Sequence, residues 1–336
     1  MTTDVAVGRA QRRVTPVWLR RRGWTLGVWV LLIVLVGWYA TLIPKFGAFQ
    51  ITSIAKNGLP LIYLAIGQAI IVTTGGIDLS VGAMLVLANS IAAQLMFEQP
   101  FWVTLAVAVL VLAIGGAINA SVGWVITVSR VPDIVVTLAT SFILAGLALV
   151  VLPSPGGGTS EGFRAMFTGS PSGSGSNFVP PILAIAIPTT LAAWWMKRTR
   201  TGLSLYATGS SLTAAYLSGV RTARAKIISY AVGGAFAALG GLSSLAITGS
   251  GESRSFTGGL FTLRSVAAIV LGGVALTGGI GSVVGAAAAG IILIMLSPIL
   301  SARGIDPNSA QVVEGVLIVA VMIVAGVIEL RRQRAS

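Results

Sequence analysis

The fold is decided by residues 73–83, which read Thr73-Thr74-Gly75-Gly76-Ile77-Asp78-Leu79-Ser80-Val81-Gly82-Ala83. Apolar runs flank this stretch over residues 59–72 and 84–96, and neither run contains a charged residue. A charged side chain near the middle of a bilayer costs about 3 kcal/mol or more. Asp78 is therefore expected to cap a helix, face water or bind something, so function is sought first at this break.

The composition is that of an integral membrane protein. Of the 336 residues, 55% are hydrophobic and 9% are charged, whereas soluble domains carry about 25% charged residues. The chain has no Cys and no His, which excludes disulfides, thiol chemistry and histidine acid–base catalysis. It has no Walker A sequence, no nucleophile elbow and no carboxylate pair within one apolar run. The sequence predicts a protein that is not an enzyme, has no cofactor of its own and holds no metal.

The net charge of +13 does not indicate binding to nucleic acid, because the basic residues only flank apolar runs. They lie before the first run (Arg9, Arg12, Arg13, Arg20, Arg21, Arg22), after a middle run (Lys197, Arg198, Arg200) and after the last run (Arg331, Arg332, Arg334). Cytoplasmic segments of membrane proteins carry such an excess of Lys and Arg. We therefore expect both termini in the cytoplasm.

Apolar runs of about 20 residues, the length that crosses the hydrocarbon, recur along the chain. The sequence predicts an all-α polytopic membrane protein with about ten transmembrane helices. The expected crossings cover residues 24–43, 56–74, 80–96, 101–128, 134–152, 178–196, 226–248, 265–276, 283–300 and 310–330. One transmembrane domain thus spans residues 24–330, between a basic cytoplasmic tail at 1–23 and a second cytoplasmic tail at 331–336.

Three segments are expected outside the membrane. Residues 153–177 are rich in Gly and Ser and predict an outer loop, which is too long for a tight connection. A second polar outer loop is expected after residue 248, carrying Glu252, Arg254 and Arg264. Residues 201–225 are amphipathic but too polar to cross. They predict a cytoplasmic surface segment, which either lies at the lipid interface or fits the groove of a partner protein.

The first break has a counterpart near the end of the chain. Residues 75–83 can be aligned with Gly278-Gly279-Ile280-Gly281-Ser282-Val283-Val284-Gly285-Ala286. Transporters are often built from repeats whose broken helices line the substrate path. A match this short also arises by chance in a chain with 42 glycines.

Polar residues inside the apolar runs have two interpretations. Asp78 or Ser80 can cap the helix that follows the break, or Asp78 can take a direct part in transport. The other polar residues either form interhelical hydrogen bonds, which contribute about 1 kcal/mol each, or line a path for a polar solute. The candidates for a substrate pathway are Gln68, Asp78, Ser80, Asn89, Asn119 and Thr137.

Four motifs, in order, resemble those of the inner-membrane permeases of bacterial ribose-type sugar ABC importers, within the branched-chain amino acid and ribose permease family. They cover residues 74–83, 131–140, 207–220 and 267–282. The sequence departs from the family pattern at three places. Ser210-Ser211 stands where Gly-Asn is frequent, Leu263-Arg264-Ser265 where an acidic residue is frequent, and Asp133 where an uncharged residue is common. These departures leave the exact sugar open.

The resemblance implies a dimeric, multi-pass permease of the bacterial inner membrane, paired with itself or with a second permease. It would translocate a monosaccharide by alternating access, with ATP bound by a cytoplasmic ATPase subunit and the sugar delivered by a periplasmic binding protein. Contact with the ATPase is expected at Gly209, Ala214, Ala215, Ser218, Gly219 and Arg221. The alternatives are a polyol, a nucleoside or a sugar-derived signal as solute, or an ion-coupled secondary transporter that uses Asp78.

Overall fold

The structure is a computed structural model that describes residues 17–173, 175–254 and 257–333. Within these residues the ordered elements are helices, apart from one isolated bridge between Gly156 and Gly251. The helices are α1 (Val17–Leu42), α2 (Ala48–Thr73), α3 (Val81–Leu95), α4 (Phe101–Ser129), α5 (Asp133–Val151), α6 (Glu161–Thr168), α7 (Val179–Arg198), α8 (Arg200–Ser210), α9 (Leu212–Leu217), α10 (Thr222–Thr248), α11 (Thr257–Leu271), α12 (Val283–Ala302) and α13 (Pro307–Gln333). Of the two predicted tails, residues 1–16 and 334–336 lie outside the described residues, and the rest continues α1 and α13.

Seven helices are long and apolar enough to cross a membrane, namely α1, α2, α4, α5, α7, α10 and α12. Three shorter apolar helical stretches cover Val81–Leu95, Gly258–Leu271 and Asn308–Ala320. The prediction of an all-helical, polytopic membrane protein is confirmed. The number of ten crossings and the cytoplasmic location of both termini stay predictions, because seven helices among the described residues meet the length and apolarity of a crossing.

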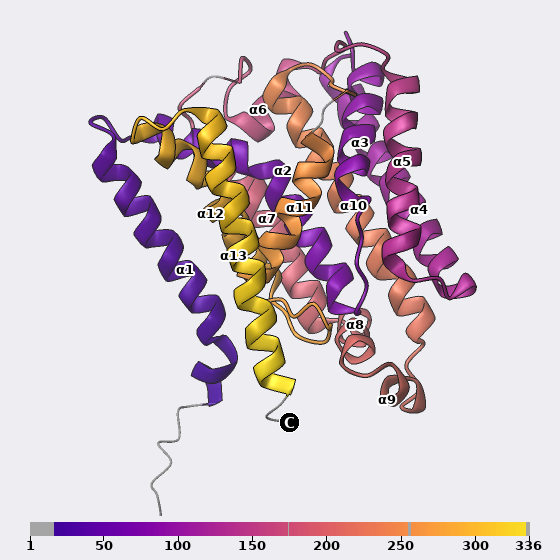
Figure 1. Cartoon of the computed structure of the whole chain (residues 1–336). Coiled ribbons are helices and arrows are strands. Elements are labelled where there is room, and N and C mark those ends of the chain that lie inside the picture. The colour runs from indigo at the N-terminus through magenta and orange to yellow at the C-terminus, as the bar shows by residue number, and fades with distance from the viewer. Residues whose placement is uncertain (1–16, 174, 255–256, 334–336) are drawn as a thin grey trace, which may run out of the picture.

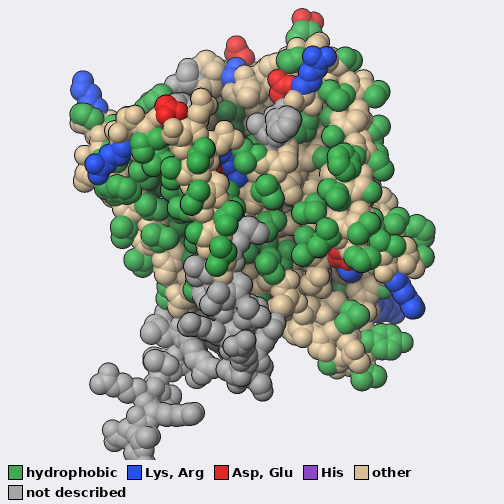
Figure 2. Space-filling model, in the orientation of Figure 1, with side chains coloured by type: hydrophobic (Ala, Val, Ile, Leu, Met, Phe, Trp, Pro, Cys, Tyr) green, Lys and Arg blue, Asp and Glu red, His purple; other side chains and the backbone are tan. Residues whose placement is uncertain are grey.

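The helices form one bundle with two distinct ends (Figure 1). At one end lie α8 and α9, together with the start of α1 and the end of α13, and at the opposite end lies α6. On the face shown in Figure 2, hydrophobic side chains cover the middle of the bundle and charged side chains gather mainly toward its two ends. That distribution is expected of a protein whose middle faces lipid.

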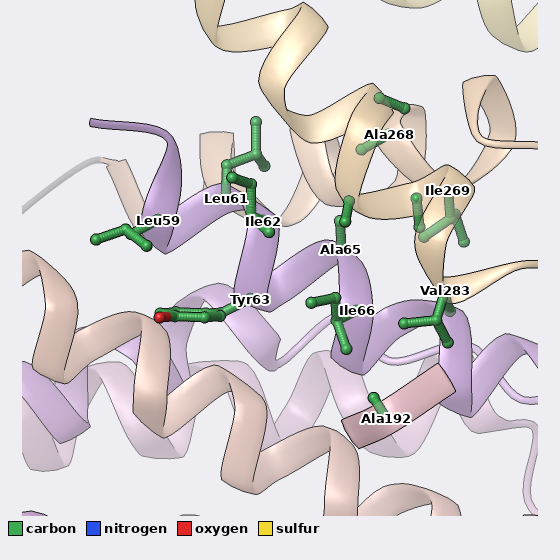
Figure 3. Packing of buried hydrophobic residues seen from close by; sticks show 14 of the residues in the cluster. Leu59, Leu61, Ile62, Tyr63, Ala65, Ile66, Ala192, Ala268, Ile269 and Val283 are labelled. Atoms are coloured by element: carbon green, nitrogen blue, oxygen red, sulfur yellow. The ribbon is translucent and has the colours of Figure 1, made fainter. Parts of the chain in front are cut away.

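Helix α2 lies at the centre of the bundle. All of its residues from Gly58 to Thr73 are buried, which is expected of a helix that is apolar all round. Figure 3 shows its buried side chains together with those of α11 and α12, including Ile62, Ala65, Ile66, Ala268, Ile269 and Val283. Because α2 ends at the first break, this rigid core fixes where the break begins.

Glycines bring α10 close to α2 and α4. A Cβ atom built on Gly67 of α2 would lie 2.8 Å from the carbonyl oxygen of Gly233, and one on Gly115 of α4 would lie 2.8 Å from that of Gly234. Cβ atoms do not approach other atoms so closely, so only glycine fits at these crossings. Small residues allow such backbone contact between membrane helices.

Two boundaries differ from the prediction. The expected outer loop contains helix α6, which Ser160 caps by accepting a hydrogen bond from the Phe163 N–H, and which buries Phe163 and Phe167. Helix α11 begins at Thr257, so Arg264 lies inside a helix and not in a loop. A charged residue is tolerated there because Glu314 of α13 forms an ion pair with it.

Candidate functional site

The first break consists of residues 74–80, between α2 and α3. Gly75 has φ +79°, a conformation that glycine adopts without strain. Asp78 follows with a fully buried side chain. Its Oδ1 accepts hydrogen bonds from the Ser80 N–H at 2.7 Å and the Ser80 hydroxyl at 2.5 Å, and its Oδ2 accepts one from Asn119 Nδ2 at 2.9 Å. Three polar donors thus surround this carboxylate, and no Lys or Arg among the described residues pairs with it.

The capping interpretation holds only in a modified form. Ser80 occupies the N-cap position of α3, but its side chain makes no capping hydrogen bond. Asp78 binds the backbone of Ser80 itself, before the helix begins. The Asp78 carboxylate therefore stabilises the turn that precedes α3. It does not accept hydrogen bonds from the free N–H groups in the first turn of that helix.

Thr137 of α5 binds the same break. Its hydroxyl accepts the Leu79 N–H at 3.1 Å and donates to the carbonyl oxygen of Asp133 at 2.9 Å. The predicted pathway residues Asp78, Ser80, Asn119 and Thr137 therefore come together around the non-helical segment between α2 and α3. All four are buried, which makes them a scaffold for the break in this conformation.

A second polar cluster, which sequence reasoning missed, adjoins the break. Lys226 Nζ of α10 lies 2.7 Å from Asp133 Oδ1 of α5, and the Tyr230 hydroxyl donates to Asp133 Oδ2 at 2.9 Å. The same hydroxyl lies 3.2 Å from the carbonyl oxygen of Ile77. The sequence alone marks Asp133 only as a departure from the family pattern. Its partners lie 93 and 97 residues away, so no local signal could find them.

Asn89 and Gln68 lie apart from these clusters. Asn89 donates to the carbonyl oxygen of Gly241 at 3.3 Å and accepts the Glu252 N–H at 2.9 Å, so it joins α3 to α10 and to the connection that follows α10. Gln68 is fully buried in α2, and neither polar atom of its amide has a partner among the described residues. The structure thus gives Asn89 an interhelical role and brings neither residue to the first break.

The second break consists of residues 272–282, between α11 and α12. It contains no charged residue, and backbone hydrogen bonds fold it, from Ala275 N–H to the Ile280 oxygen and from Gly278 N–H to the Ala275 oxygen. Gly273, Gly278 and Gly279 have positive φ angles. Ser282 caps α12 by accepting the Gly285 N–H.

The two breaks meet at helix α8. The Gly279 N–H donates to the carbonyl oxygen of Thr73 at 3.0 Å. A Cβ on Gly209 of α8 would lie 2.0 Å from that same oxygen and 2.6 Å from the Gly279 nitrogen. The Tyr206 hydroxyl of α8 donates to the Gly281 oxygen at 3.1 Å, and burial raises the pKa of that hydroxyl, which keeps it a donor. Helix α8 therefore contacts both breaks directly.

The predicted contact residues of the surface segment fall into two groups. Gly209 faces inward against the breaks and Ala215 is buried, whereas Ala214, Ser218, Gly219 and Arg221 are exposed. Gly219 has φ +80° and open space around it, so the turn itself explains this glycine. The prediction missed the large apolar residues beside them: Leu212, Tyr216 and Leu217 are 62%, 71% and 79% exposed.

Comparison with known proteins identifies the family. Residues 50–324 match the model of a family described as the branched-chain amino acid transport system permease component. The chain belongs to this family. The ribose import permease protein RbsC of Escherichia coli (strain K12) is 32% identical over 330 residues, which cover 96% of this chain and 98% of RbsC.

Two other permeases of this family are similar over most of their length. The galactose/methyl galactoside import permease protein MglC of Escherichia coli (strain K12) is 29% identical over 87% of this chain and 91% of its own. The ribose import permease protein RbsC of Bacillus subtilis (strain 168) is 29% identical over 89% of this chain and 91% of its own. No solved structure is significantly similar to the chain. The similarity reaches from α2 to α13, so both breaks and α8 belong to the family region.

Proposed function

We propose that this permease is the membrane-spanning subunit of an ATP-driven importer for a monosaccharide. The observation that carries the proposal is the similarity, over nearly the whole of both chains, to permeases named for the import of ribose and galactose. A polyol, a nucleoside or a sugar-derived signal is the alternative solute. ATP would be bound by a partner subunit, because the chain has no phosphate-binding loop of its own.

The surface of α8 and α9 is the proposed contact with the ATPase. Three large apolar side chains, Leu212, Tyr216 and Leu217, are exposed at an end of the bundle where charged residues also gather. Apolar residues that protrude together at such an end mark a protein contact. Ala214, Ser218, Gly219 and Arg221 lie on the same short segment and would surround them.

Motion of the α8–α9 surface can be transmitted directly to the membrane helices. Because Gly209 and Tyr206 of α8 contact both breaks, a shift of α8 displaces the ends of α2 and α12 together. Tightly packed contacts transmit small shifts because there is no free space to absorb them. We propose that closure of the ATPase drives alternating access through this contact. A second permease copy, or a sister permease, would form the other wall of the path, and a periplasmic sugar-binding protein would dock at the α6 end.

The test is purification from native membranes in mild detergent, followed by an ATPase assay and by uptake in cells. We expect a stoichiometric nucleotide-binding subunit and uptake that follows the ATP level. Leu217→Glu on α9 should abolish co-purification of that subunit, whereas Leu95→Glu, on an exposed Leu at the end of α3, should not. Recovery of the permease alone, with uptake that collapses when the proton gradient is dissipated at constant ATP, would favour an ion-coupled transporter.

A further inference from the structure

A polar cavity of about 570 Å³ lies between α1, α2, α11, α12 and α13. The polar part of its wall consists of Gln50, Ser53 and Asn57 of α2, Ser297 and Ser301 of α12, Arg264 of α11 and Glu314 of α13. The rest of the wall is made of larger apolar side chains, namely Tyr39, Phe49, Ile54, Leu293, Ile294 and Pro298. The α2 residues belong to its first turns and Ser297 to the last turns of α12, so the cavity lies toward the end of the bundle opposite α8. Small-molecule sites have volumes of about 300–1,000 Å³, so this space accommodates a small solute.

The wall of this cavity contains an ion pair that is largely buried. Arg264 Nη2 and Glu314 Oε2 lie 2.5 Å apart, with side chains only 18% and 7% exposed. Arg264 Nε is buried and has no hydrogen-bond partner among the described residues. An ion pair between two apolar helices loses most of its hydration, and an apolar pair of the same volume would join α11 to α13 at least as well. Ionisable residues within membrane helices usually mark a solute or ion path.

The buried polar residues around the first break offer no such space. Asp78, Ser80, Asn119 and Thr137 are fully buried. Their side-chain polar atoms bond one another or the backbone, apart from Asn119 Oδ1, which has no hydrogen-bond partner among the described residues. None of these four lines the cavity. A polar solute therefore finds open space beside Arg264, whereas the unpartnered oxygen of Asn119 beside Asp78 is fully buried and does not line this cavity.

A neighbouring cavity provides the contrast. A space of about 420 Å³ shares Ile54 with the polar cavity and is lined almost entirely by apolar side chains, among them Trp29, Leu32 and Ile291. A lipid acyl chain would enter that space, because apolar surface favours an apolar occupant. The polar cavity is thus distinguished from its surroundings by the chemistry of its wall.

We propose that the polar cavity is a binding site for a neutral, polyhydroxylated solute of the size of a pentose or hexose. The paired charges cancel, so an anion would face Glu314 and a cation would face Arg264, whereas hydroxyl groups can donate to one and accept from the other. Asn57 and Gln50 add amide groups that can form more than the single bonds they make to Ser53 and Gly47. Arg264 and Glu314 are then specificity-determining residues. This inference rests on the proposed function, whose solute it places.

The experiment uses the absence of Cys from the chain. Ser297→Cys puts one thiol in the cavity, and Ser309→Cys puts one at an exposed position in the first turn of α13, outside the cavity. Cells expressing each variant with the intact transport system are treated with a membrane-impermeant maleimide, with and without excess D-ribose or D-galactose, whichever the wild-type cells take up. We expect the transported sugar to slow labelling of Ser297→Cys at least fivefold and to leave Ser309→Cys unchanged.

A second variant tests the two charged residues themselves. Arg264→Met/Glu314→Met replaces both members of the ion pair, so neither charge is left buried without a partner and misfolding is avoided. We expect it to reach the membrane, to bind the ATPase subunit normally and to raise the sugar concentration for half-maximal uptake at least tenfold. Uptake without protection of Ser297→Cys, or with unchanged sugar dependence in the double variant, would overturn this inference alone. Absence of uptake of any sugar by wild-type cells would overturn the proposed function with it.

Discussion

The two helix breaks have similar sequences but different construction. The first follows the 26-residue α2 and leads into the 15-residue α3, whereas the second follows the 15-residue α11 and leads into the 20-residue α12. Side chains hold the first break, with Asp78 bonded to Ser80 and Asn119. Backbone turns with positive-φ glycines hold the second.

This difference in construction determines how easily each break can change its conformation. A carboxylate with specific donors fixes one geometry of the first break, because moving it would leave a buried charge without hydrogen bonds. The second break has no such requirement, and its glycines allow other backbone conformations at little cost. We infer that the second break is the more adaptable of the two.

The largest loss of unfolding free energy is expected for a substitution of Gly209, where the two breaks meet. Gly209→Val places side-chain atoms on the Thr73 oxygen and the Gly279 nitrogen, which a Cβ alone would approach to 2.0 Å and 2.6 Å. Overpacking usually costs about 1–3 kcal/mol and more against rigid backbone, so we expect at least about 3 kcal/mol of lost unfolding free energy. Thermal unfolding of the purified protein in detergent measures it.

The matched control is Gly259→Val in α11, where a Cβ meets nothing within 4 Å. Valine has a slightly higher helix propensity than glycine, so this variant should unfold at an unchanged or slightly higher temperature. Equal thermal stability of the two variants would show that the breaks do not depend on contact with α8.

Sequence reasoning predicted the helical membrane fold because the apolar runs are long and continuous, as in α4 and α12. It singled out four polar residues within apolar runs as candidates for a substrate pathway, namely Asp78, Ser80, Asn119 and Thr137. The structure places these four residues close together. It could not pair Asp78 with Asn119, since 41 residues separate them and helix packing sets the distance. It placed Arg264 in a loop because the residue that neutralises it, Glu314, is 50 positions away.

The second prediction concerns the side chains of the first break. Asn119→Leu removes the donor to Asp78 Oδ2 and leaves that buried oxygen without a partner. Hydrogen bonds to charged groups contribute about 1.5–3 kcal/mol, so we expect a loss of about 2 kcal/mol in the same unfolding measurement. Ser121→Leu, at an exposed position of the same helix, should change little.

A double variant sharpens this result. An unpartnered neutral amide costs less than an unpartnered buried charge, so Asp78→Asn/Asn119→Leu should recover part of the stability lost in Asn119→Leu. The side-chain oxygen of the introduced Asn can still accept the two hydrogen bonds from Ser80. If the double variant is instead the less stable by the sum of the two single losses, the carboxylate does not hold the break through Asn119.

The third prediction concerns the ion pair beside the first break. Lys226→Met leaves Asp133 with the Tyr230 hydroxyl alone. The pair is partly exposed, at 24% and 16% of its side-chain surfaces, so solvent screens it and the expected loss is about 1–2 kcal/mol. A double-mutant cycle with Asp133→Asn measures the coupling. Additive losses would mean that Lys226 contributes nothing through Asp133.

The smallest loss of unfolding free energy is expected at the second break, where the Ser282 side chain caps the start of α12. The Ser282 hydroxyl accepts the Gly285 N–H, so Ser282→Ala removes a helix cap and should cost about 1 kcal/mol. Ser282→Asp should retain the stability because a carboxylate caps equally well, and Ser301→Ala, at an exposed site on the same helix, should be neutral. If Ser282→Ala costs as much as Asn119→Leu, side chains hold both breaks equally and the proposed difference in adaptability is wrong.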